Sequence, residues 1–109
     1  MFVIDKDTNA ITIIKKDTAS FILALDNYNL EEGDSVKFTV ASSLESQSPS
    51  ISKTVTTFID GTATIELDTT DTNIAEGKYY YDIQVDTHEG VRDTVIGPAS
   101  FTVKGGVTY

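Results

Sequence analysis

Two runs flank a turn-rich corner of this chain: Ala63-Thr64-Ile65-Glu66-Leu67 and Gly77-Lys78-Tyr79-Tyr80-Tyr81-Asp82-Ile83-Gln84-Val85. Both runs alternate apolar and polar residues. Successive side chains of an extended strand point to opposite faces, so the alternation predicts two β-strands that each bury one face and expose the other. On this phase Tyr79 and Tyr81 point inward with the aliphatic residues of the second run, and Tyr80 points outward. These two runs therefore predict strands and the faces that they bury, and they do not indicate a catalytic or binding activity.

Tyr79 lies two residues before Tyr81, at the start of the strand that follows the corner. In immunoglobulin-type sandwiches a tyrosine occupies this position, two residues before a cysteine, and its hydroxyl bonds the backbone of the preceding corner. Tyr81 stands where that cysteine would be. We therefore predict that Tyr79 and Tyr81 are structural corner residues, and that the Tyr79 hydroxyl bonds backbone within residues 73–75.

Further short strands are predicted at regular spacing, without any helical period. In the first half of the chain the inward positions are Ile11 and Ile13, then Phe21, Leu23 and Leu25, then Val36, Phe38 and Val40. Later strands are predicted at 51–59, 91–96 and 99–104. Asp60-Gly61 predicts a hairpin turn, since that turn needs positive φ. Gly97-Pro98 predicts a break in the ladder, because proline has no backbone N–H to donate. The whole pattern predicts an all-β, immunoglobulin-like β-sandwich of about seven to nine antiparallel strands. We expect one domain over residues 1–104 and a flexible tail over 105–109.

Composition narrows the classes of partner. The 109 residues fit one domain, and the absence of cysteine excludes disulfides. The formal net charge is −9, so the basic footprint that nucleic acids and anionic membranes require is missing. Asp5-Lys6-Asp7 interrupts any apolar run of a secretory signal, and no stretch approaches the ~20 apolar residues of a membrane span. We expect no signal peptide, no membrane insertion and no nucleic-acid partner.

Candidates for catalysis or metal binding are few. His88 is the only histidine and lies in the turn 86–90, with no cysteine or second histidine to join it, so we expect a surface-turn histidine. Asp68-Thr69-Thr70-Asp71-Thr72-Asn73 and the pair Asp5/Asp7 offer oxygen ligands for calcium, but neither matches the calcium loop with its glycine and terminal glutamate. The other carboxylates fall mostly at turns or outward strand positions. We expect no enzyme activity, no catalytic residues, no cofactor and no metal site.

The alternation places some apolar side chains on strand faces that are exposed to water, and these residues are the candidates for partner contact. They are Ile14, Ile22, Tyr80, Ile96 and Tyr109, the last with Val107 in the tail. Together, on a sheet with open edges, such residues suit a protein–protein contact. A strand that twists or bulges so as to bury them is the alternative. A second alternative is a carbohydrate- or cell-surface-binding module that uses the aromatics Tyr28, Tyr80 and Tyr109.

Several segments together resemble tailed-phage structural modules. They are Gly61-Thr62-Ala63-Thr64-Ile65-Glu66-Leu67, Asp71-Thr72, Gly77-Lys78-Tyr79-Tyr80-Tyr81-Asp82-Ile83, Val95-Ile96-Gly97 and Phe101-Thr102-Val103, with the front-end segments 17–23 and 33–38. The pattern G-x-A-x-I-x-L, then G-x-Y-x-Y-x-I, then a short strand after a glycine, is similar to the N-terminal immunoglobulin-like domain of phage baseplate upper proteins and related small prophage proteins.

The resemblance covers most of the chain and implies a non-enzymatic scaffolding or adaptor piece of a virion, in its tail, baseplate or neck. It implies other virion proteins or copies of the same chain as partners, and a homo-oligomer within an assembly. A sandwich without a signal peptide or cysteine fits a virion part that is assembled in the host cytoplasm.

Overall fold

The computed structural model describes residues 3–4, 10–25, 28–43 and 49–105. These residues form eight strands and no helix: β1 (Val3–Ile4), β2 (Ile11–Ile14), β3 (Ala19–Leu23), β4 (Ser35–Ala41), β5 (Ile51–Val55), β6 (Ala63–Leu67), β7 (Gly77–Asp86) and β8 (Arg92–Lys104). The prediction of an all-β chain is confirmed. No described segment is a helix long and apolar enough to cross a membrane. The candidate residue Tyr109 and most of the predicted tail lie outside the described residues.

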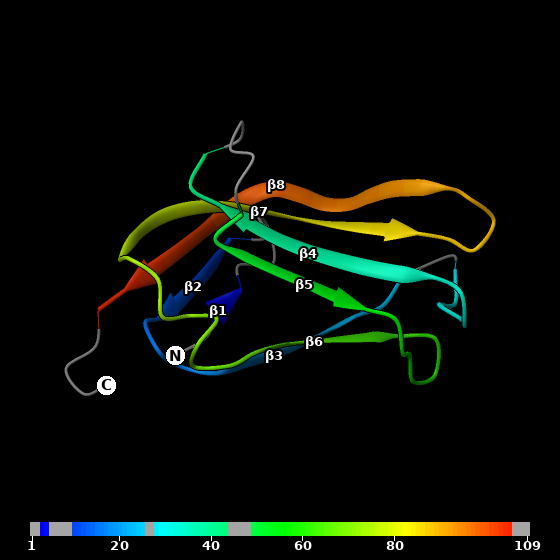
Figure 1. The fold of residues 1–109 in the computed structure, drawn as a ribbon, viewed down its shortest axis with the longest axis horizontal. Helices are drawn as coiled ribbons and strands as arrows, with labels where there is room; N and C mark the ends of the chain where they lie inside the picture. The colour runs from blue at the N-terminus through cyan, green and yellow to red at the C-terminus, as the bar shows by residue number, and fades with distance from the viewer. Residues whose placement is uncertain (1–2, 5–9, 26–27, 44–48, 106–109) are drawn as a thin grey trace.

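The strands form two sheets, one of six strands in the order β1-β2-β8-β7-β4-β5 and one of two strands, β3-β6 (Figure 1). The expectation that all strands are antiparallel is wrong at one pair, because β2 runs parallel to β8. A parallel pair cannot be joined by a tight turn, and here almost the whole chain separates the two strands. The six-stranded sheet is therefore mixed.

One core lies between the two sheets and takes side chains from both. Along β7 the residues Tyr79, Tyr81, Ile83 and Val85 are buried and their neighbours are not, as the alternation predicted. Phe38 on β4 is fully buried, and aromatic rings on β3, β7 and β8 surround it. The alternating residues of the corner thus build the centre of the core.

The Asp60-Gly61 turn forms as predicted, with positive φ at both residues (51° and 77°) and the bridge between Ile59 and Thr62 closing it. The strands that it joins do not form a hairpin, because β5 ends at Val55 and belongs to the six-stranded sheet, whereas β6 belongs to the other. The predicted strand 51–59 is therefore too long. The turn instead carries the chain from one sheet to the other.

The predicted break at Gly97-Pro98 is a local irregularity inside one strand. β8 runs along β7 from Arg92 to Lys104, but the register slips between Tyr81 and Ile83, where Ala99 and Ile96 are the partners. Proline fits there because a bulge leaves its position without a ladder hydrogen bond to make. The two expected strands, 91–96 and 99–104, are thus one strand.

Candidate functional site

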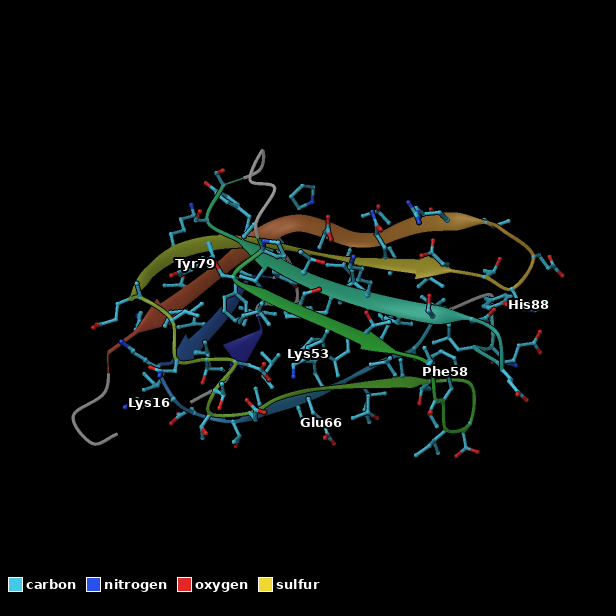
Figure 2. All side chains as sticks on the ribbon, in the orientation of Figure 1. Lys16, Lys53, Phe58, Glu66, Tyr79 and His88 are labelled. Carbon is cyan, nitrogen blue, oxygen red and sulfur yellow. The ribbon has the colours of Figure 1, made fainter. Side chains whose placement is uncertain are left out.

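Three connections meet at one end of the molecule: residues 24–34, 56–62 and 87–91. The strand registers place them together, since Ser35 pairs with Asp86 and Val36 pairs with Val55. The Leu30 N–H also donates a hydrogen bond to the Gly61 carbonyl at 3.1 Å. We call the described residues of these three connections the loop end. Figure 2 shows His88 and Phe58 at this end and Lys16 at the opposite end.

A buried carboxylate, Asp34, ties the loop end together. Asp34 is only 2% exposed. Its Oδ1 accepts from the His88 backbone N–H at 2.8 Å and lies 2.9 Å from His88 Nδ1. Its Oδ2 accepts from the Tyr28 hydroxyl at 2.8 Å and from the Glu31 N–H at 3.0 Å. A buried charge is tolerated only when it is hydrogen-bonded in this way, so Asp34 fixes residues of two loops against each other.

The electrostatics of this cluster follow from its geometry. Burial alone would raise the pKa of Asp34, but hydrogen bonds from His88, Glu31 and Tyr28 outweigh it and hold that pKa well below its usual range. The hydrogen bond to Asp34 raises the pKa of His88 against the effect of burial, and nearby Glu31 and Glu89 raise it further. The same carboxylate raises the pKa of Tyr28 to about 12.

Both ring nitrogens of His88 face carboxylates, since Nε2 lies 3.3 Å from Glu31 Oε1 while Nδ1 faces Asp34. Only the doubly protonated imidazolium has a donor on each nitrogen, so this arrangement favours charged His88. A general base needs a free nitrogen lone pair near its substrate. His88 in this arrangement is placed to hold loops together.

The close approach of two loops requires Gly33. Its φ is +97°, and a Cβ built at this position would lie 2.8 Å from His88 Cβ. Real Cβ atoms do not approach so closely, and side chains rarely adopt this φ. Glycine therefore lets the loop before β4 lie directly against His88.

Two hollows flank the loop of residues 28–34. One, of about 300 Å³, has an apolar wall of Leu25, Val85, Val91 and Val95, with Glu89 and Asp93 at its rim. We call it the β8 hollow. The other, of about 380 Å³, lies between Leu30, Glu31 and Phe58. Ile59 and Val91, both at the loop end, are 69% and 56% exposed. The loop end thus combines fixed loops with accessible apolar surface.

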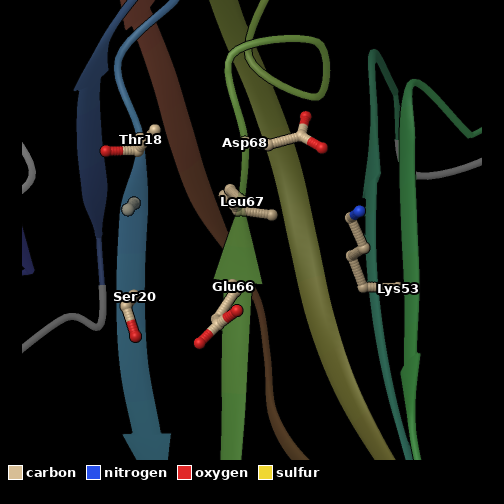
Figure 3. A pocket seen from close by; sticks show the side chains of 7 residues that line it. Thr18, Ser20, Lys53, Glu66, Leu67 and Asp68 are labelled. Atoms are coloured by element: carbon tan, nitrogen blue, oxygen red, sulfur yellow. The ribbon is translucent and has the colours of Figure 1, made fainter.

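A third hollow, of about 460 Å³, lies over the two-stranded sheet (Figure 3). Lys53 borders it from β5, where it shares the inward face with its partner Phe38. Lys53 Nζ lies 2.8 Å from Asp71 Oδ2, and the hydrogen bond to Asp71 raises the pKa of Lys53. An inward-pointing charge on an edge strand is a common protection against unwanted strand pairing. This hollow therefore has a structural explanation.

The turn of residues 68–73, which offers oxygen ligands but does not match the calcium loop, is held by its own hydrogen bonds. The Asp68 N–H donates to Asp71 Oδ2 at 2.9 Å, and the Asp71 N–H donates to Asp68 Oδ1 at 2.8 Å. These carboxylates thus act as turn residues. Across residues 3–4, 10–25, 28–43 and 49–105, no group of three or more His, Asp or Glu side chains is arranged to hold a metal ion. Asp5 and Asp7 lie outside these ranges.

The predicted contact residues do not come together on one surface. Ile22 is 68% exposed on β3, as its phase predicted. Ile14 and Tyr80 are half-buried. Ile96 is half-buried and packs against the core beside the register shift, which is the bulge alternative. Tyr28 lies at the loop end, while Tyr80 pairs with Ala41 near the other end, so these two aromatics do not share a platform.

Both predicted corner residues are buried. The Tyr79 hydroxyl donates to the Ala75 carbonyl at 2.6 Å, which confirms the predicted bond to the preceding corner. Tyr81 is 3% exposed, and burial raises its pKa to about 12.

The Asp34 cluster was not predicted from the sequence. His88 lies in a surface turn as expected, but its partner Asp34 is 54 residues away along the chain. An aspartate after a glycine and before a strand is typical of a turn, and no local signal marks it as buried. Only the placement of the two loops side by side reveals the pair.

Comparisons with protein-family models, with curated proteins and with solved structures found no match. The resemblance to phage baseplate modules therefore stays a prediction, and function has to be inferred from the geometry of the chain.

Proposed function

We propose that this chain is an immunoglobulin-like sandwich that serves as a non-enzymatic interaction module of a phage or prophage virion, in its tail, baseplate or neck. Two features support the fold assignment. The neighbours β8, β7 and β4 occur in the order of the G, F and C strands, and β3 pairs with β6 as B pairs with E. The Tyr79 hydroxyl bonds a carbonyl four residues upstream, as the tyrosine corner does.

The observation that carries the proposed function is the construction of the loop end. Asp34 forms hydrogen bonds with both His88 and Tyr28, and these bonds hold the loops against each other. Beside them lie two hollows and the exposed side chains of Ile59 and Val91. Loops held by a rigid β-scaffold are a common binding surface, and accessible apolar patches mark protein contacts. This arrangement favours binding over catalysis.

The virion assignment rests on the resemblance of the strand and turn patterns to baseplate modules. The net charge of −9 agrees with it, since a coat or tail component that handles no nucleic acid needs no basic surface. Partners are then other virion proteins or copies of the chain itself.

Mass spectrometry and immunogold electron microscopy of purified particles test this proposal. A strain that carries a C-terminally tagged copy is induced, and particles are purified by density gradient with a high-salt wash to remove adsorbed protein. We expect the chain at a fixed ratio to the other structural proteins and the gold label at one substructure. Complete, infectious particles that lack the chain would overturn the assignment.

A further inference from the structure

The β8 hollow lies against the core, since Val85 belongs to the core and Leu25, Tyr28 and Val95 pack against it. Near the loop end Asp93 pairs with Val85 and so shares its inward face, yet Asp93 is exposed. β2 pairs with β8 only at residues 101–104, so among the described strands β7 alone pairs with the first half of β8, whose other edge is open. The result is an apolar wall with the carboxylates of Asp93 and Glu89 above it.

This rim has the charge of a cation-binding surface. The loop end carries the exposed carboxylates Glu31, Glu32, Asp60 and Glu89, and Asp93 is exposed on the neighbouring part of β8. Arg92, the single arginine of the chain, pairs with Asp86 at 2.7 Å. Within the described residues the side chain of Asp93 makes no hydrogen bond or ion pair. A protein segment that combines aliphatic groups with a cation fits this hollow best.

The chain itself has such a surface at its other end. Ile14 pairs with Lys104, so these two side chains share the outward face of the six-stranded sheet, opposite the face of the buried pair Ile13 and Val103. Lys78 pairs with Thr102, two residues before Lys104, so Lys78 lies on the same face. We call Ile14, Lys78 and Lys104 the lysine end. Carboxylates also lie near it, at Asp68 and Glu76, so the match is between particular side chains and not between uniformly charged faces.

The two surfaces cannot meet within one molecule. The molecule measures 45 × 29 × 26 Å, with the loop end and the lysine end at opposite ends of its long axis (Figures 1 and 2). A contact between them has to join two copies head to tail.

We propose that the β8 hollow of one copy receives the lysine end of a second copy. The stems of Lys78 and Lys104 and the side chain of Ile14 cover the apolar wall, and the two ammonium groups meet Asp93 and Glu89. Long lysine side chains commonly bury their stems while the charge stays at the surface. Such a contact is heterologous, so it builds rings or open filaments. The inference rests on the proposed function and names the interface between copies.

Sedimentation velocity over a wide range of concentration tests the contact in the full-length chain. The net charge of −9 on each copy opposes association, so we expect a weak, concentration-dependent series of dimers and longer species. The double variant Glu89→Lys with Asp93→Lys removes the acceptor surface, and Lys78→Gln with Lys104→Gln removes the donor surface. We expect each double variant alone to associate about tenfold more weakly or not at all.

Mixing the two double variants gives the decisive result. Each mixed pair retains one intact acceptor and one intact donor, so we expect dimers that grow no further. Lys37→Gln with Glu66→Gln, at exposed positions outside the β8 hollow and the lysine end, is the control and should associate like the wild type. Circular dichroism checks that every variant keeps the wild-type β spectrum.

A wild-type chain that stays monomeric at the highest concentration would overturn the proposed contact. So would association that both double variants retain, because another surface would then be responsible. Either result leaves the virion assignment intact if particles contain the chain. Particles without the chain would overturn that assignment while the self-association stands, so the two failures are distinguishable.

Discussion

Replacing Tyr79 by Phe removes one hydroxyl from the corner and leaves the buried ring in place. The hydroxyl donates to the Ala75 carbonyl at 2.6 Å, and one intramolecular hydrogen bond contributes about 0.5–1.5 kcal/mol to stability. Ala75 itself is exposed, so water can bind the released carbonyl and the larger cost of a buried, unsatisfied group is avoided. We therefore expect Tyr79→Phe to lower the free energy of unfolding by about 1 kcal/mol. For a domain of this size that loss lowers Tm by about 4 °C.

Tyr80→Phe is the matched control, because it removes the same atom from the next residue on the opposite face. Tyr80 is half-buried, its hydroxyl makes no hydrogen bond within the described residues, and the Lys78 ammonium above its ring stays in place. We expect a change within about 0.5 kcal/mol. Urea unfolding followed by far-UV circular dichroism measures both variants, with an unchanged m-value as the sign of a pure stability effect. Equal losses in the two variants, or no loss in Tyr79→Phe, would refute the role of the corner hydrogen bond.

Three further predictions concern the loop end and the edge strand. Folding raises the pKa of His88, so charged His88 stabilises the fold fully below about pH 6.5, and this contribution is lost as the pH rises through the raised pKa. Folding lowers the pKa of Asp34, so ionised Asp34 stabilises the fold fully above about pH 4, and this contribution is lost as the pH falls through the lowered pKa. Urea midpoints should therefore be highest in mild acid, and His88→Asn should flatten their alkaline decline; an unchanged decline would contradict this. Gly33→Ala should destabilise the fold more than Gly90→Ala, since both have positive φ but only the first places a Cβ against another side chain; equal urea midpoints would show that the close approach does not matter. Lys53→Met should have a urea midpoint near that of the wild type, because methionine replaces the inward-packed stem and the ion pair with Asp71 is partly exposed. Lys53→Ala removes the stem and should have a clearly lower midpoint. The reverse order would mean that the charge of Lys53 contributes more to stability than its stem does.

The strand pattern could be predicted from the sequence because it depends on local alternation. The inward phase of β6 and β7, the Asp60-Gly61 turn and the Tyr79 hydrogen bond all follow from residues close together in the chain. The pairing of strands is a different kind of information. That β5 and β6 separate into different sheets, and that β2 runs parallel to β8, depends on contacts between distant segments, which periodicity does not encode.

The candidate site was harder to predict for the same reason. Asp34 and His88 are typical turn residues, and the sequence around each position does not indicate that Asp34 is buried or that the two side chains form a hydrogen bond. Ile96 was predicted to be exposed from its place in an alternating strand, and the register shift beside it turns it toward the core. Sequence reasoning found the exposed Ile22 on β3, where the phase is regular, and missed the loop end, where side chains from three connections meet.

An aromatic cluster lies at the centre of the core of this chain, which has no cysteine or tryptophan. Phe38 lies between Tyr81 on its own sheet and Phe21 on the opposite sheet, with ring centroids 5.5 Å apart in both pairs. Phe101 completes the cluster at 6.2 Å from Phe38 and 6.3 Å from Tyr81. Phe21–Phe38 is the pair of these four that joins the two sheets, and at about 0.5–1.5 kcal/mol it contributes less than the 2–5 kcal/mol or so of a native disulfide. Because this contact is made by packing, its strength does not depend on redox conditions.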